Sequence, residues 1–374
     1  MDNGLVKTNR LVVIDSLRGF AIAAVFLIHT TNHFLSGIFP AESDLFCADL
    51  DVFLKNLMYF CFENKAFCIF ALFFGFTFAL QKDKFTPKVA KIAAKTVNFK
   101  TFMVKRIALL VLFGILNAAF FAGGDPLVFY ALCMFIVIPL ENLKTKWIAF
   151  LTVVLLIQPT DVIHSFVPLW EYTYYDEYGK ISEVLMTGDM FDTFWANITY
   201  GLKGCLLWAL QEGRFVQTLG LFMLGILAYR LGWFRNTEKW SRKYILFILT
   251  TILLYIVQKY CIDFFKMYYN LAFTASIIAV YAHLFNKFGN VGIFKHFSVY
   301  GKMSLTNFVG QSIFGAILYY PWALNLGVKL GVTVSLLITI VLIVMQIAFS
   351  HLWLRKHRRG PLEELWSRLT FNRR

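Results

Sequence analysis

The sequence predicts an all-α integral membrane protein, and three observations lead to that fold class. Of its 374 residues, 59% are hydrophobic and 16% are charged, and the mean hydropathy is +0.63. The apolar residues form long runs, and basic residues gather in only some of the polar stretches between them. A soluble domain of this length requires far more polar surface. We therefore expect about ten membrane-spanning helices in one polytopic domain covering residues 1–374.

The predicted spans are apolar runs of nearly the length that crosses the roughly 30 Å hydrocarbon core as a helix. They cover residues 11–35, 57–81, 105–122, 126–141, 146–164, 214–232, 244–261, 267–286, 298–320 and 331–353. The runs at 126–141 and 146–164 contain Pro139 and Pro159, so they fit a regular span least well.

Lys and Arg residues orient these spans, because cytoplasmic loops carry an excess of positive charge. Residues 82–106 contain eight basic residues against the single acid Asp83, whereas residues 36–51 contain four acids and no Lys or Arg. The C-terminal residues 355–374 are again rich in Arg and Lys. We therefore expect residues 36–51 outside and both termini in the cytoplasm.

One apolar stretch, residues 193–210, does not fit as a span. It contains Asn197, Lys203 and Gly204, and counting it as a crossing would invert every later basic loop. We expect this stretch to lie in the outer interface or to be re-entrant.

Charge and cysteine patterns exclude several other classes of protein. The formal net charge is +14, but the basic residues lie between apolar runs, so we expect a lipid bilayer and no nucleic acid as partner. The six cysteines are scattered without a C-x-x-C pair. No Walker motif, dinucleotide loop or haem-type spacing occurs, so we expect no tightly bound cofactor.

The first predicted span carries the densest set of ionisable residues, which are costly in a membrane and point to function. Arg18 and His29 are eleven residues apart, close to three helical turns, so they share a face about 16 Å apart along the axis. Asp15 and His33 are expected to extend that stripe.

Each of these residues also has a purely structural explanation. Asp15 and Arg18 fit an i, i+3 ion pair at the membrane boundary as well as a ligand site for phosphate or carboxylate. His29 fits either a core histidine bonded to a neighbouring helix or a general base. His33 with His29 lacks the Glu of a zincin motif and a third ligand, so we predict no metal.

Three candidates lie at the outer ends of other spans. Glu63 marks either an interfacial turn or a catalytic carboxylate, and Arg214 fits an anionic acceptor site or an interfacial anchor. Asp125, in a Gly-Gly-Asp-Pro turn, fits a helix cap better than a catalytic group. At the other end, residues 355–359 form a basic patch for anionic lipids or a nucleotide phosphate.

Several segments together resemble a known family. They are residues 10–19 (RLVVIDSLRG), 72–81, 106 with 112–114, 124–125 with 130–132, 221–230 (LFMLGILAYR), 301–307 (GKMSLTN) and 360–370 (GPLEELWSRLT). The chain is similar to the YeiB-like family of bacterial inner-membrane proteins, a domain of unknown function. The resemblance implies a multi-pass inner (plasma) membrane protein with a family-specific C-terminal module at about residues 214–372.

That family is in turn similar to the transmembrane acyltransferases, which place acetyl from acetyl-CoA on extracytoplasmic sugars. The polysaccharide enzymes share an Arg, ten residues and a His in the first helix, and Arg18 and His29 have that spacing. The resemblance implies that His29 is catalytic. The chain departs from the family at His29 itself, where many YeiB-like members have Asn, at Asn117, where members typically have His, and at Pro126, where Ile is usual.

These observations favour a membrane acyltransferase that moves an acyl group, with acetyl the favoured one, from cytoplasmic acyl-CoA to an envelope glycan or small metabolite outside. Acyl-CoA would then be a co-substrate. The alternative is a transporter or exporter of an anionic small molecule, in which Arg18, Arg214 and the histidines line a path. A third interpretation, a non-catalytic envelope-assembly partner, gives Arg18 and His29 no role beyond stability.

Overall fold

The computed structural model describes residues 2–35, 37–85, 98–124, 126–157, 172–260, 266–289 and 292–371. Within these ranges the secondary structure is entirely helical, so the all-α prediction is confirmed. The helices are α1 (Asp2–Thr31), η1 (His33–Leu35), η2 (Glu42–Asp44), α2 (Ala48–Phe62), α3 (Lys65–Lys84), α5 (Phe99–Ala118), α6 (Pro126–Val137), η3 (Ile138–Asn142), α7 (Thr145–Leu156), α9 (Tyr174–Thr187), α10 (Met190–Ala196), η4 (Asn197–Gly201), α11 (Leu202–Gln211), α12 (Arg214–Arg230), η5 (Trp233–Arg235), α13 (Thr237–Ser241), α14 (Tyr244–Tyr260), α15 (Lys266–Phe288), α16 (Gly292–Lys302), α17 (Ser304–Tyr319), η7 (Leu326–Val328), α18 (Val332–Lys356) and α19 (Pro361–Phe371).

Four helical segments of the described chain are long and apolar enough to cross a membrane, which supports a membrane protein. They are Val12–Thr31, Ala48–Lys84, Lys266–Phe288 and Val332–Lys356. Three further apolar helices, in Pro126–Asn142, Thr145–Leu156 and Tyr244–Tyr260, are shorter. The count of ten spans therefore stays a prediction.

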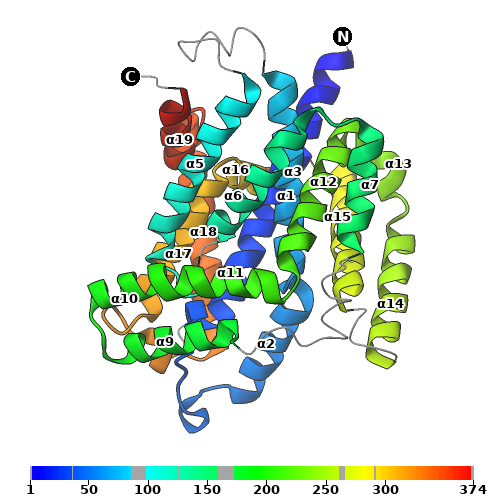
Figure 1. Ribbon diagram of the computed structural model, residues 1–374. Coiled ribbons are helices and arrows are strands. Elements are labelled where there is room, and N and C mark those ends of the chain that lie inside the picture. The colour runs from blue at the N-terminus through cyan, green and yellow to red at the C-terminus, as the bar shows by residue number, and fades with distance from the viewer. Residues whose placement is uncertain are drawn as a thin grey trace.

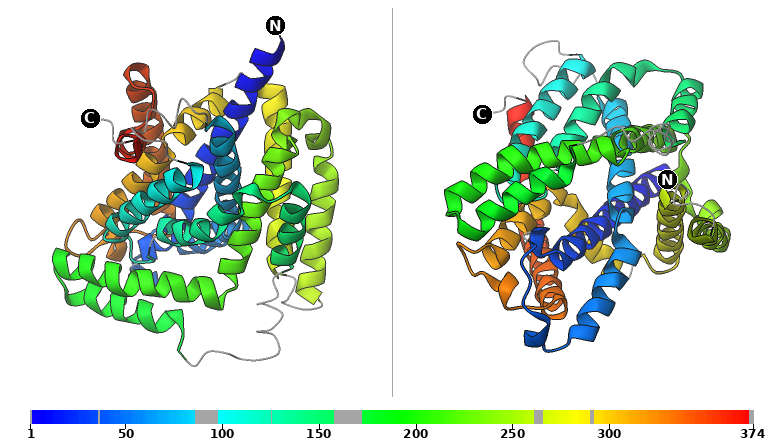
Figure 2. Two further views of the ribbon diagram at one scale, coloured as in Figure 1. Left: turned by 45° about the horizontal axis from the view of Figure 1, so that its top comes forward. Right: turned by 60° about the horizontal axis from the view of Figure 1, so that its bottom comes forward.

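The helices have a clear polarity along the molecule. In Figure 1, both chain ends lie at the top, and α2, α9 and α10 lie at the bottom. The continuous segment α10–η4–α11, which includes residues 193–210, lies crosswise to α1, and the views of Figure 2 agree. This stretch therefore does not run along the bundle beside α1.

Glycines bring two helix pairs into backbone contact. A Cβ atom on Gly301 of α16 would lie 1.9 Å from the Asp15 carbonyl oxygen of α1. A Cβ on Gly225 of α12 would lie 2.0 Å from the Leu72 carbonyl oxygen of α3. Small residues permit this close approach of helices, and it explains why these glycines stand in the family-like segments.

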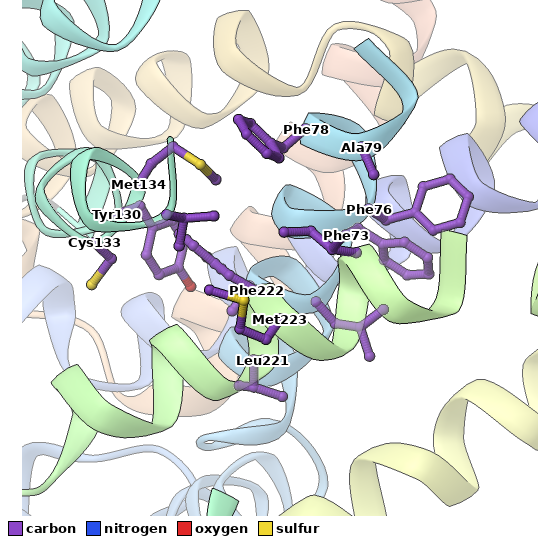
Figure 3. Packing of buried hydrophobic residues seen from close by; sticks show 14 of the residues in the cluster. Phe73, Phe76, Phe78, Ala79, Tyr130, Cys133, Met134, Leu221, Phe222 and Met223 are labelled. Atoms are coloured by element: carbon purple, nitrogen blue, oxygen red, sulfur yellow. The ribbon is translucent and has the colours of Figure 1, made fainter. Parts of the chain in front are cut away.

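Aromatic side chains fill the space around the crossing of α3 and α12. Figure 3 shows Phe73 and Phe76 of α3, Tyr130 of α6 and Phe222 of α12 in one buried cluster. The Tyr130 and Phe222 rings pack edge to face with their centroids 5.7 Å apart. This cluster fixes α3, α6 and α12 relative to one another.

The C-terminal helix α19 is tied to the start of α17. The Glu363 carboxylate accepts hydrogen bonds from the backbone N–H groups of Leu305 (2.7 Å) and Thr306 (3.1 Å) and from the Thr306 hydroxyl (2.6 Å). The Trp366 indole donates to the Arg106 carbonyl oxygen at 2.8 Å. A carboxylate at a helix N-terminus satisfies free N–H groups and complements the helix dipole. The GPLEELW and GKMSLTN segments therefore form one structural unit.

Candidate functional site

A cavity of ≈ 440 Å³ lies beneath α19, and we call it the α19 cavity. Its charged lining residues come from six separate parts of the fold: Arg18, Lys84, Arg106, Lys302, Arg359 and Glu363. Five of these six are basic, and the one acid, Glu363, is already bonded to the start of α17. This cavity therefore suits a ligand that carries several negative charges.

Arg18 forms the ion pair with Asp15 that the sequence allowed and also lines the α19 cavity. Its guanidinium lies 3.8 Å from the Asp15 carboxylate, donates to the Ser304 hydroxyl at 2.5 Å and lines the α19 cavity. Asp15 does not line that cavity in the described part of the chain. We conclude that Asp15 and Ser304 orient Arg18 toward the cavity.

Arg106 is a site residue that the sequence analysis did not single out. Its guanidinium carbon lies 3.6 Å from the centre of the Trp366 ring, and no described group bonds its buried Nε atom. Flat stacking on an aromatic face holds a guanidinium in place while leaving its N–H edge free for an anion. Arg106 and Trp366 both stand in the family-like segments, but Arg106 also ends a basic stretch, where topology alone explains it.

A second cavity of ≈ 480 Å³ forms where several helix ends converge, and we call it the His29 cavity. It brings together three of the predicted residues, namely His29, Glu63 and Arg214. Asp125 lies outside the described residues, although its neighbours Gly124 and Pro126 line the cavity. Gly124 has a φ of +72°, which glycine adopts without strain, and its backbone approaches Gly201 of η4 closely.

His29 lines this cavity. The imidazole stacks on Phe121, with centroids 4.5 Å apart, and meets the edge of Phe34 at 5.8 Å. Within the described ranges, no hydrogen bond to either ring nitrogen is found. The aromatic contacts orient the ring, and its nitrogens remain available to a ligand.

His33 does not continue the stripe of His29, and this expectation was wrong. Helix α1 ends at Thr31, and His33 has a φ of 43°, so its side chain leaves the helical face. Nδ1 donates to the Ile38 carbonyl oxygen at 3.0 Å, and Nε2 lies 3.1 Å from the Ser335 hydroxyl. The buried ring also stacks on Tyr319, so His33 joins α1 to α17 and α18.

Arg214 opens α12 at the wall of the His29 cavity and is 94% buried, with a relative exposure of 6%. One terminal nitrogen donates to the Gln217 amide oxygen at 2.9 Å and contacts the Met267 sulfur at 3.2 Å. The Trp208 ring lies 5.6 Å from the guanidinium carbon. Arg214 is therefore held by neutral groups.

A layer of aromatic side chains separates the two cavities. Phe70 lines both of them, and its ring stacks on Tyr130 with centroids 6.0 Å apart. The Tyr130 hydroxyl donates to the Phe67 carbonyl oxygen at 3.3 Å. Helices α1, α3, α6 and α17 each contribute side chains to both cavities.

Comparison with known proteins finds a family similarity in the C-terminal part of the chain. Residues 228–373 match the family described as "Protein of unknown function (DUF418)". This region is similar to that family. The resemblance to the YeiB-like family that the motifs indicate is thereby confirmed.

Two relatives match nearly the whole chain. The uncharacterized protein YxaH of Bacillus subtilis (strain 168) is 24% identical over 394 residues, covering 98% of this chain and 95% of that protein. An uncharacterized 39.9 kDa protein from the amylase 3' region of Bacillus acidopullulyticus is 23% identical over 378 residues, with the same coverage. No solved structure matches the chain.

Proposed function

We propose that this protein is a membrane acyltransferase that takes an acyl group from acyl-CoA in the α19 cavity and transfers it to an acceptor in the His29 cavity. One observation carries the proposal. Helix α1 contributes Arg18 to the first cavity and His29 to the second, and Phe70 is a wall of both. The helix rises about 16 Å between Arg18 and His29, a length that an extended pantetheine arm can bridge.

The α19 cavity fits the donor because coenzyme A carries several phosphate charges. Arg18, Arg106 and Arg359 offer guanidinium groups, which bind phosphate through paired hydrogen bonds. The aromatic residues that line the same cavity, among them Phe73 and Phe74, suit the apolar acyl chain.

In the proposed reaction, a nitrogen of His29 accepts the proton of an acceptor hydroxyl while that oxygen attacks the thioester carbonyl carbon. The new C–O bond forms as the C–S bond breaks. The imidazolium then returns the proton to the coenzyme A sulfur, so an ester, a free thiol and neutral His29 result. Opening of the Phe70–Tyr130 layer is required for the thioester to meet His29.

The charge distribution supports a cytoplasmic donor side. The basic stretch of residues 82–106 and the basic C-terminal residues contribute Lys84, Arg106 and Arg359 to the α19 cavity. Under the positive-inside rule, this charge distribution supports a cytoplasmic α19 cavity, cytoplasmic chain ends and a His29 cavity that faces outside. We propose on this basis a multi-pass protein of the inner membrane with about ten spans.

Thermal stabilisation of detergent-purified protein by acetyl-CoA and longer acyl-CoAs tests the donor site. We expect a dose-dependent rise in Tm that is lost in Arg18→Ala and kept in His29→Ala. Arg242→Ala, an exposed arginine paired with Glu238, is the matched control. The absence of any rise up to millimolar acyl-CoA would overturn the proposal.

Two cavities separated by an aromatic layer also suit a transporter of an anionic small molecule, and product analysis separates the two functions. Proteoliposomes are supplied with isotope-labelled acetyl-CoA and a cell-envelope extract. The acyltransferase yields a labelled acceptor of increased mass and free coenzyme A. Movement of a chemically unchanged solute, without label transfer, would establish the transporter instead.

A further inference from the structure

Arg214 is an unusual arginine because it is buried at a cavity wall and forms no ion pair with any described residue. Within the described ranges, no carboxylate oxygen lies within 4 Å of its guanidinium nitrogens, and its Nε has no hydrogen-bond partner. A buried charge is normally paired, because its desolvation is otherwise costly. A ligand in the His29 cavity that brings its own negative charge would supply the missing partner.

The backbone around Arg214 favours an anion independently of the side chain. Arg214 is the first residue of α12, a helix of 17 residues, and no side chain caps its N-terminus. The first N–H groups of a helix lack internal partners and carry the positive end of the helix dipole. Together with the guanidinium, they form a site for carboxylate or phosphate.

The rest of the His29 cavity fits a hydroxylated ring. Tyr175 and Trp208 line the cavity, and sugar rings stack on aromatic rings through their C–H groups. Glu63 and Glu212 also line the cavity and offer carboxylates that accept hydrogen bonds from hydroxyl groups. Glu212 already accepts one such bond, from the Tyr174 hydroxyl at 3.1 Å.

We infer that the acceptor is a sugar bearing an anionic group, with its carboxylate or phosphate against Arg214 and the first turn of α12 and a hydroxyl near His29. The inference rests on the proposed function, because it takes the His29 cavity as the acceptor site. The site would then prefer an anionic sugar to a neutral one, because only the anionic sugar pairs with the buried Arg214 guanidinium.

The test measures the Tm of the detergent-purified full chain with glucuronate, glucose 6-phosphate or glucose at matched ionic strength. We expect one or both anionic sugars to raise Tm with dose, and glucose to bind at least tenfold more weakly. Arg214→Gln, which retains an amide donor for Gln217, should weaken the anionic sugar at least tenfold. Arg242→Gln is the matched control and should leave the affinity unchanged.

The responding sugar identifies the anionic group as carboxylate or phosphate. Equal stabilisation by glucose, no response to either anionic sugar, or an unchanged response in Arg214→Gln would each overturn the inference. If Arg214→Gln does not fold, the comparison of anionic and neutral sugars on the wild-type protein still decides. Acetyl-CoA stabilisation, measured on the same samples, reports on the proposed function separately, because Arg214 does not line the α19 cavity.

Discussion

The α19 cavity and the His29 cavity share four helices but differ in how their charges are held. In the α19 cavity, five basic side chains from separate elements surround one acid, and that acid is bonded to a helix start. In the His29 cavity, the buried Arg214 and one lysine, Lys266, lie among aromatic rings and the carboxylates of Glu63 and Glu212. A cluster of cations favours a polyanion, which relieves its repulsion, whereas a cavity of mixed charge with one buried guanidinium favours a single anionic group. One bundle thus offers two chemically distinct sites at opposite sides of an aromatic layer.

The largest expected effect separates chemistry from donor binding. We expect His29→Ala to lower acyl transfer about 10²–10⁴-fold, the usual contribution of a general base, while acetyl-CoA still raises Tm. The measurement is the initial rate of label transfer beside a thermal titration. His283→Ala is the matched control, because His283 packs against Tyr244 and lines neither cavity. Full activity of His29→Ala would contradict the assignment of the catalytic base to the His29 cavity.

A reciprocal pair of arginine variants tests whether the two sites are independent. Arg106→Gln should weaken acetyl-CoA binding about 10–100-fold, since a hydrogen bond to a charged group contributes about 1.5–3 kcal/mol. Arg106→Gln should leave the affinity for the anionic sugar unchanged. Arg214→Gln should weaken binding of the anionic sugar and leave the affinity for acetyl-CoA unchanged. Thermal titrations with both ligands measure the four affinities. If either variant lost binding of both ligands, the two cavities would form one connected site.

A change at the crossing of α3 and α12 should affect both cavities together. The Cβ of Gly225→Ala meets the Leu72 carbonyl oxygen, so the helices must separate, at a cost of about 1–3 kcal/mol of unfolding free energy. Gly179→Ala is the matched control, because nothing lies within 4 Å of its Cβ. Tm with and without each ligand is the measurement. An unchanged Tm in Gly225→Ala would contradict the close contact.

A change in α19 should affect one cavity only. Glu363→Ala removes three hydrogen bonds to the start of α17 and should cost about 0.5–2 kcal/mol of stability, as loss of a helix cap does. Acetyl-CoA affinity should fall and anionic-sugar affinity should not. Glu364→Ala, which loses only exposed pairs with Arg359 and Arg368, is the matched control. Equal behaviour of the two variants would argue against the cap.

The smallest expected effect is a pH dependence of stability that arises from Glu177, in a helix that lines the His29 cavity. Burial raises the pKa of Glu177 on α9, but hydrogen bonds from Lys203 and Tyr172 outweigh it and hold the pKa below its ordinary value of 4.5. The stabilisation is therefore present above pH 4.5 and is lost as pH falls through the lower pKa of the folded state.

Tm measured from neutral to acidic pH for wild type and Glu177→Gln tests this dependence. The difference in Tm should shrink below pH 4.5. Anionic-sugar binding should weaken over the same range, because α9 supplies Tyr174, Tyr175 and Tyr178 to the His29 cavity. If the Tm difference between wild type and Glu177→Gln stays constant with pH, Glu177 is not an ionised group held by hydrogen bonds.

The sequence by itself determined the helical membrane class and the two central residues of α1. Hydropathy and charge are local properties, so long apolar runs and basic stretches are visible without a structure. The eleven-residue spacing of Arg18 and His29 likewise fixes their separation within one straight helix. The family resemblance came from short motifs, which the match of residues 228–373 confirmed.

The tertiary structure alone decided which distant residues share a cavity. Arg359 and Trp366 share a cavity with Arg18 of α1 and Arg106 of α5 only because α19 docks on α5 and α17, and glycine contacts set how closely the helices pack. His33 left the predicted stripe because its own backbone, with a φ of 43°, ends the regular helix. Such contacts depend on side chains far apart in the chain, so helical periodicity predicts the face of one helix but not the neighbour that it meets.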